Sequence, residues 1–204
     1  MTEWVDKGAL QECLERARWL WREYRKRTQL HNYGLMEKGK VKEVIREMET
    51  NLRRVDPLWR LVRPYDLVVN HDTLYIVVTR ALANLPSLEK VTQFNRRRFQ
   101  QFCGFGACWR EKKNYNPRMK RALMAYLVYV TFPLHLPARS FWGEQVREEY
   151  KRLRQKRRKA SPFHLSRLAL LNVGRCLVKE LYALCRQAAA AQGEPSTNPS
   201  CVDV

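Results

Sequence analysis

The chain has 204 residues, of which 45% are hydrophobic, 11% aromatic and 29% charged. This composition is typical of a globular protein and argues against a mostly disordered one. Lys and Arg number 39 against 20 Asp and Glu, so the formal net charge is +19 and the pI is about 10.1. A surface of this sign attracts polyanions and repels other copies of the chain, so we expect a polyanionic partner.

Cysteine usage and hydropathy indicate where such a protein resides. The six cysteines have no dense or regular spacing, and several lie on apolar helix faces, as reduced and buried thiols do. The first twenty residues carry acids and bases throughout, unlike a secretory signal peptide. No window approaches 18 uncharged apolar residues, so we expect no transmembrane segment. A soluble intracellular protein is therefore predicted.

The N-terminal half has the apolar spacing of amphipathic helices. A long helix is predicted from Ala9 to about Leu30, followed by a turn and a second, antiparallel helix from about Glu37 to Arg53. Residues 58–62 predict a short helical turn after Asp56-Pro57. Residues 67–83 fit either a strand or a helix capped near Asp72, and we favour the helix because no second strand with a hairpin turn offers a partner.

The C-terminal half predicts further helices and a tail. One helical stretch is expected from Ser87 to about Phe102, and the most buried helix from Ala122 to Thr131. A loop at 132–139 leads to a basic helix, and an apolar helix begins at Pro162. We therefore predict a mainly α protein: a single compact basic domain of about six to eight helices over residues 1–186. Residues 187–204 are small, polar and Pro-bearing, and predict a disordered tail.

A central segment, Gln93 to Arg121, interleaves aromatic and basic residues. Cations that follow a phosphate backbone beside rings that stack on bases would suit a nucleic-acid surface of low sequence preference. Buried phenylalanines beside a solvated charge run would have the same pattern, so both interpretations stay open. The predicted phosphate contacts here are Arg96, Arg97, Arg98, Arg110, Lys112 and Lys113.

The densest basic run is KRLRQKRRK, directly before Ser161-Pro162. A short block of Lys and Arg of this density is recognised by nuclear import receptors and by phosphates alike. A basic helical face with no partner is the alternative. We predict a nuclear localisation signal formed by Lys151, Arg152, Arg154, Lys156, Arg157, Arg158 and Lys159, and hence a location in the nucleus of the host cell.

The helix that begins at Pro162 has a second possible use. The segment from His164 to Val173 resembles the BC-box of the lentiviral virion infectivity factors, which recruit Elongin C to a ubiquitin ligase. The matching residues are Leu165, Leu168, Ala169, Leu170 and Val173. His164 departs from the Ser or Thr of that pattern, and the zinc-binding His-Cys array of the family is not found. Core packing of an ordinary amphipathic helix explains the same residues.

Metal and catalytic signals are weak. Cys103 and Cys108 have metal-ligand-like spacing, but a structural zinc site needs four N or S ligands, and the scattered histidines do not complete the set. The sequence also has no GxSxG, HExxH or kinase signature. The adjacent pair His71-Asp72 is explained by helix capping. We therefore predict a protein that is not an enzyme and uses no cofactor, with zinc binding by the cysteine pair left open.

The overall format resembles the small accessory nonstructural proteins (NP) of parvoviruses, of the chaphamaparvovirus type. The resemblance is carried by EWVDKGALQECLERARWLWREYRKRTQLHNYG, by QFNRRRFQQFCGFGACW and by KRLRQKRRK, in a chain of about this length. It implies residence in the nucleus and support of viral DNA replication or viral RNA processing, and it transfers no catalytic residue.

Three function classes follow. The leading prediction is a non-catalytic viral accessory protein that is nuclear and associated with DNA or RNA. The alternative is a host-protein adaptor that presents the helix Leu165 to Val173 to a partner such as Elongin C. A matrix-like protein on anionic lipid is the third, because charge alone does not separate lipid phosphate from nucleic-acid phosphate.

Overall fold

The computed structural model describes residues 6–65, 71–106, 115–132 and 137–190, and within these ranges the chain forms nine helices and no strand. The predicted mainly α fold is confirmed, with one helix more than the expected range. The helices are α1 (Lys7–Asn32), α2 (Lys38–Arg53), α3 (Asp56–Val62), α4 (Asp72–Ala83), α5 (Leu88–Thr92), α6 (Arg96–Phe102), α7 (Pro117–Thr131), α8 (Phe141–Lys156) and α9 (Pro162–Ala190).

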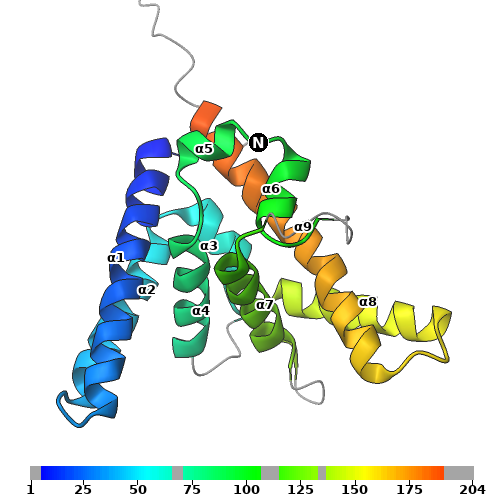
Figure 1. Ribbon diagram of the computed structural model, residues 1–204, viewed down its shortest axis with the longest axis horizontal. Coiled ribbons are helices and arrows are strands. Elements are labelled where there is room, and N and C mark those ends of the chain that lie inside the picture. Colours follow the sequence, from blue (N-terminus) through cyan, green and yellow to red (C-terminus); the bar gives the residue numbers. More distant parts are fainter. Residues whose placement is uncertain (1–5, 66–70, 107–114, 133–136, 191–204) are drawn as a thin grey trace, which may run out of the picture.

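The helices pack side by side from one edge of the molecule to the other (Figure 1). The antiparallel pair α1 and α2 forms one edge, α4 and α7 lie in the middle, and α8 with the beginning of α9 forms a hairpin that projects at the other edge. Helix α9 is 29 residues long and packs on α8, α7, α6, α5 and α3. Buried side chains from all nine described helices form one hydrophobic cluster, and α9 packs on most of the other helices.

The stretch predicted as one helix from Ser87 to Phe102 is two short helices, and this prediction was wrong. The Ser87 side chain caps α5 by accepting a hydrogen bond from the Lys90 N–H at 3.4 Å. The Asn95 side chain caps α6 by accepting from the Arg98 N–H at 2.8 Å. An Asn side chain competes with the backbone for hydrogen bonds and favours a cap over a helix interior. The chain therefore bends at Asn95, which accounts for the additional helix.

Three other helix starts differ from the prediction. Pro57 lies in the first turn of α3, where a missing N–H costs nothing, so the helix begins at Asp56. His71 occupies the cap position of α4 and Asp72 is its first residue, so Asp72 is not the cap. Helix α7 begins at Pro117, before the predicted start, because the Asn116 side chain accepts hydrogen bonds from the first-turn N–H groups of residues 118 and 119.

The hairpin of α8 and α9 is anchored to α7 by a close backbone contact. A Cβ at Gly143 would lie 2.1 Å from the Val130 carbonyl oxygen, so only glycine permits this approach of α8 to α7. Val130 also accepts a hydrogen bond from the Arg139 N–H at 2.8 Å, which fixes that carbonyl. Next to Gly143, the Trp142 indole N–H donates to the Leu61 carbonyl at 2.8 Å and ties α8 to the end of α3.

Helix α9 continues through Ala190, beyond the predicted end of the domain at Arg186. The alanine run has the highest intrinsic helix propensity, and Ala188 is fully buried in the core. The boundary at residue 186 was therefore placed too early. Of the tail predicted to be disordered, residues 191–204 lie outside the described residues.

The cysteines agree in part with the expectation of buried thiols. Cys13, Cys103 and Cys185 are buried and free, whereas Cys176 is exposed on α9. Burial raises the pKa of Cys13 and of Cys185 to about 12, because an apolar environment disfavours the thiolate. The buried thiols are consequently packing groups and not nucleophiles at neutral pH.

Candidate nucleic-acid interface

The predicted central phosphate surface is described in its first half. Arg96, Arg97 and Arg98 are exposed in the first turn of α6, and the Arg98 guanidinium carbon lies 5.2 Å from the centre of the Phe94 ring. Among the described residues these three arginines have no carboxylate within ion-pair distance. The other three predicted contacts, Arg110, Lys112 and Lys113, lie outside the described residues.

The four phenylalanines of the same segment pack in or against the core. Phe99 and Phe105 are buried, and Phe94 and Phe102 pack against the core cluster. The Tyr182 hydroxyl donates to the Phe94 carbonyl at 2.7 Å, which fixes this segment on α9. Of the two interpretations left open by the sequence, the structure favours buried phenylalanines beside a solvated charge run. The contacts of these rings are therefore with the core.

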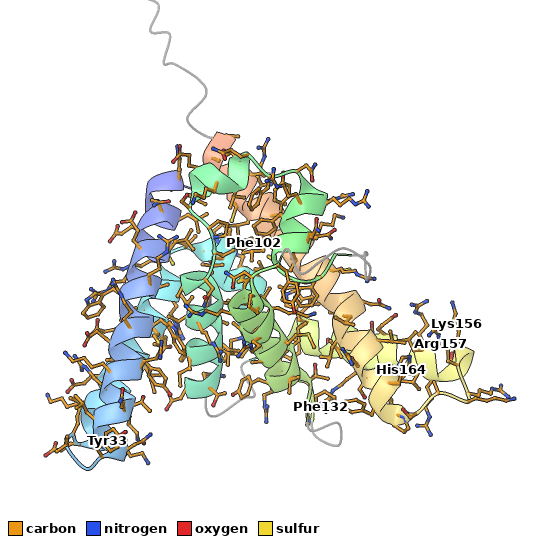
Figure 2. All side chains as sticks on the ribbon, in the orientation of Figure 1. Tyr33, Phe102, Phe132, Lys156, Arg157 and His164 are labelled. Carbon is orange, nitrogen blue, oxygen red and sulfur yellow. The ribbon has the colours of Figure 1, made fainter. Side chains whose placement is uncertain are left out.

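The second basic region lies at the end of the projecting hairpin. Helix α8 ends at Lys156, a turn follows, and α9 begins at Pro162. Figure 2 shows Lys156 and Arg157 at this end of the molecule, together with His164. We call the following exposed cations the basic tip: Lys151, Arg154, Lys156, Arg157, Arg158 and Lys159.

Two shallow hollows lie within the basic tip. One, of about 390 Å³, is lined by Lys151, Arg154 and Gln155, which share one face of α8, and by Arg158 in the turn that follows. The other, of about 440 Å³, is lined by Gln155, Ala160 and the cations from Lys156 to Lys159. Gln155 and Arg158 border both hollows. The tip therefore forms a continuous basic surface over the end of α8 and the following turn.

The acids near the tip are few and already engaged. Residues 150–179 contain ten Lys and Arg and no Asp or Glu. Arg152 pairs with Glu149 at 2.5 Å, and Glu149 also accepts a hydrogen bond from the Asn172 amide of α9 at 2.8 Å. The Arg152 hydrogen bond, and then that of Asn172, hold the pKa of Glu149 below its usual value. Among the described residues, the remaining cations Lys151, Arg154, Arg157, Arg158 and Lys159 have no carboxylate within ion-pair distance.

The two basic surfaces are separated along α9. Helix α6 contacts α9 at its middle, where the Gln100 amide donates to the Arg175 carbonyl at 3.2 Å. The basic tip adjoins the first turn of α9 at Pro162. Thirteen residues of α-helix correspond to about 20 Å. The cations predicted from the two segments therefore form two surfaces and not one patch.

One aromatic residue at the tip was not recognised from the sequence. Phe163 is 79% exposed, directly after Pro162, and the neighbouring His164 ring is also exposed. A signal was present, because Phe163 precedes the buried Leu165 by two residues and so lies about 200° around the helix from it. An apolar ring placed opposite the buried face has no partner within the described domain.

The BC-box-like residues face inward. Leu165, Ala169 and Val173 are buried, and Leu168 is partly buried against the core cluster. The resemblance therefore falls on the face by which α9 holds the domain together. A partner such as Elongin C would have to displace that packing before it reached this face, so the structure gives the adaptor prediction no exposed surface at these residues.

The possible metal ligands are not assembled in the described part of the chain. Cys103 is fully buried, and burial raises its pKa well above the usual value, which opposes the thiolate that zinc requires. Cys108 lies outside the described residues. Across the described ranges, no group of three or more His, Cys, Asp or Glu side chains could hold a metal ion.

Comparison with protein-family models, with curated proteins and with solved structures finds no match to this chain. In the described ranges no helix is both long and apolar enough to span a bilayer. The exposure and charge of the two basic surfaces are therefore the main guide to function.

Proposed function

We propose that this protein is a non-catalytic nucleic-acid-binding protein whose principal contact surface is the basic tip of the α8–α9 hairpin. Arg96, Arg97 and Arg98 form a second phosphate-binding surface. The observation that carries the proposal is the set of exposed cations at the tip in a stretch of thirty residues that contains no acid.

Counterion release provides the free energy of such binding. Each cation that neutralises a phosphate releases condensed counterions, so affinity falls steeply as salt rises. If the six cations of the tip all engage a single strand, the slope of log K against log salt is about −4, at roughly 0.7 per contact. Arginines add geometric fit, because a guanidinium donates two parallel hydrogen bonds to a phosphate.

The same cations support the proposed nuclear location. The run from Lys151 to Lys159 is exposed except for Leu153, and its last three cations lie in the turn after α8. Import receptors and phosphates would thus compete for one surface. A role in viral DNA replication or viral RNA processing, which the resemblance to parvovirus accessory proteins implies, is part of the proposal.

The test is a set of binding curves for the purified protein across a salt series. Labelled single-stranded DNA, single-stranded RNA, duplex DNA and vesicles containing phosphatidylserine are the probes. We expect tight nucleic-acid binding with a steep salt dependence and weaker vesicle binding. Negligible nucleic-acid binding near physiological salt would overturn the proposal, and preferential vesicle binding would replace it with a membrane-surface function.

A matched pair of variants locates the surface. Replacing Arg157, Arg158 and Lys159 by Gln should reduce the salt slope by about 2 and the affinity by at least tenfold. The control replaces Arg22, Arg25 and Lys26, three exposed cations of α1, and changes the net charge equally. Equal losses in the two variants would show that net charge, and not the tip, determines binding.

A further inference from the structure

We infer that the basic tip selects single-stranded nucleic acid, because Phe163 is a stacking platform for an unpaired base. This inference rests on the proposed nucleic-acid binding and specifies its substrate class. It is carried by the position of an exposed aromatic ring beside a cluster of cations that lack acidic partners in the described chain.

Exposure of Phe163 is unusual for its residue type. With 79% of its surface accessible, it is more exposed than Tyr33, Leu35, Phe141 and the other large hydrophobic side chains that lie at the surface of the described chain. A phenylalanine side chain buries about 150–250 Å² when it is covered, so leaving it in water forgoes much of the available stabilisation. Nothing within the described core covers it, and a ligand at the tip would.

The surroundings of the ring indicate the chemistry of that ligand. Lys159 precedes Phe163 by four residues, so their Cα atoms are at most about 15 Å apart. The exposed His164 ring adjoins on the C-terminal side, and Arg167 is exposed one turn further along α9. An aromatic face among cations matches a strand that carries phosphates on one side and flat bases on the other. An apolar protein or a neutral ligand would find no complement in these charges.

Single strands are favoured over duplexes for a geometric reason. In a duplex, the faces of the bases are covered by their stacked neighbours, and the deep major groove of A-form RNA excludes side chains. Only an unpaired base can present its face to Phe163. Cations of the tip contact the phosphates of either form, so the ring adds affinity for single strands alone.

Three substitutions test this mechanism. Phe163→Ala should weaken binding to a labelled single-stranded oligonucleotide at least about fivefold, the lower end of a base-stacking contribution, and leave duplex binding unchanged. Phe163→Tyr should bind like the wild type, and Phe163→Leu, which keeps an apolar side chain without a ring, should bind like Phe163→Ala. Because the side chain is exposed, all three variants should retain the wild-type melting temperature.

The matched control is Tyr33→Ala in the turn between α1 and α2. Tyr33 is 70% exposed and lies at the opposite edge of the molecule from Lys156, Arg157 and His164, as Figure 2 shows. This variant should bind both probes like the wild type. DNA and RNA single strands of one sequence, measured in parallel, show whether the sugar contributes.

The outcomes separate the two proposals. If the wild type binds duplex and single strands with a steep salt slope but Phe163→Ala binds both unchanged, the stacking inference is overturned and nucleic-acid binding stands. Stacking is also overturned if Phe163→Leu retains wild-type affinity or if duplex binding falls as much as single-strand binding. If the wild type binds neither probe, the proposed function itself has failed.

Discussion

The two edges of the molecule are helical hairpins of similar size and similar arginine content (Figure 1). They differ in how many of their cations are paired with carboxylates. In the α1–α2 pair, several arginines are paired with glutamates across the interface, although Arg22 and Arg25 have no carboxylate within ion-pair distance among the described residues. Arg16 pairs with Glu47 at 2.5 Å, and Arg54 pairs with Glu12 at 3.1 Å. In the α8–α9 hairpin, Arg152 forms an ion pair with Glu149, and the following cations of the tip have no carboxylate within ion-pair distance among the described residues: Lys151, Arg154, Arg157, Arg158 and Lys159.

This difference indicates that cations of equal charge are not equally available to a polyanion. An arginine that already faces a carboxylate has part of its field cancelled and its side chain oriented, so it contributes little to capture of a polyanion. An arginine in an acid-free turn keeps its full charge for a ligand. We therefore expect the net charge of +19 to attract a polyanion most strongly where acids are missing, and not simply where cations are most numerous.

The largest effect that we expect is a loss of stability when the close contact between α8 and α7 is disrupted. Gly143→Ala places a Cβ 2.1 Å from the Val130 carbonyl, which is backbone and does not move cheaply, so we expect a loss of about 3 kcal/mol in the free energy of unfolding. Gly39→Ala in α2 is the control, because no atom lies within 4 Å of its added Cβ, and helix propensity should stabilise it by up to about 1 kcal/mol. Urea denaturation measures both. Equal stabilities for the two variants would contradict the close contact between α7 and α8.

An acid introduced at the tip should give its cations a carboxylate partner, as several cations of the α1–α2 pair have. Gln155 borders both hollows, so Gln155→Glu brings a negative charge among Lys151, Arg158 and Lys159. A new unit charge near a bound phosphate costs about 1 kcal/mol in water, or about fivefold in affinity. The control, Gln29→Glu, makes the same chemical change at an exposed position of α1 and should have little effect on binding. Electrophoretic mobility shifts at fixed salt distinguish the two results.

The smallest effect that we expect is on stability, from Glu149, which links α8 to α9 through Asn172. The pKa of Glu149 is lowered in the folded protein, so its stabilisation is complete above the unfolded value of about 4.3 and is lost as pH falls through the folded value. We expect Glu149→Gln to lower stability by at most about 1 kcal/mol at pH 7 and to match the wild type near pH 3. Chemical denaturation across this range checks it, with the exposed Glu148→Gln as control. A difference that stays constant with pH would rule out the ionised carboxylate as its cause.

The helices could be predicted because their signals are local. Apolar spacing located α1, α2, α4 and α9, whereas several helix starts were not predicted correctly. Asn95 shows the limit of this approach: a single Asn inside a periodic apolar stretch is compatible with a helix, and only its cap geometry reveals the bend.

The sequence predicted which residues make up the candidate site, but not which of them are exposed and unpaired. The run from Lys151 to Lys159 is evident from the sequence, but whether a cation is paired depends on residues far away in the chain, as with Glu12 and Arg54, which are 42 positions apart. Phe163 was missed for a related reason. Its exposure follows from the way α9 packs its Leu165 face against the core, which assigns the opposite face to solvent.

The uninterrupted helix α9 holds the two basic surfaces at a set separation. About 20 Å of helix separates Pro162, next to the tip, from the contact of α6 with Arg175, and an α-helix stretches little. A single strand must be several nucleotides long to reach from one surface to the other. Under the proposed function, a shorter strand would occupy one surface at a time, whereas a longer one would engage both and gain from the high effective concentration of the second contact. Strand length, as well as charge, would then set how firmly a nucleic acid is held.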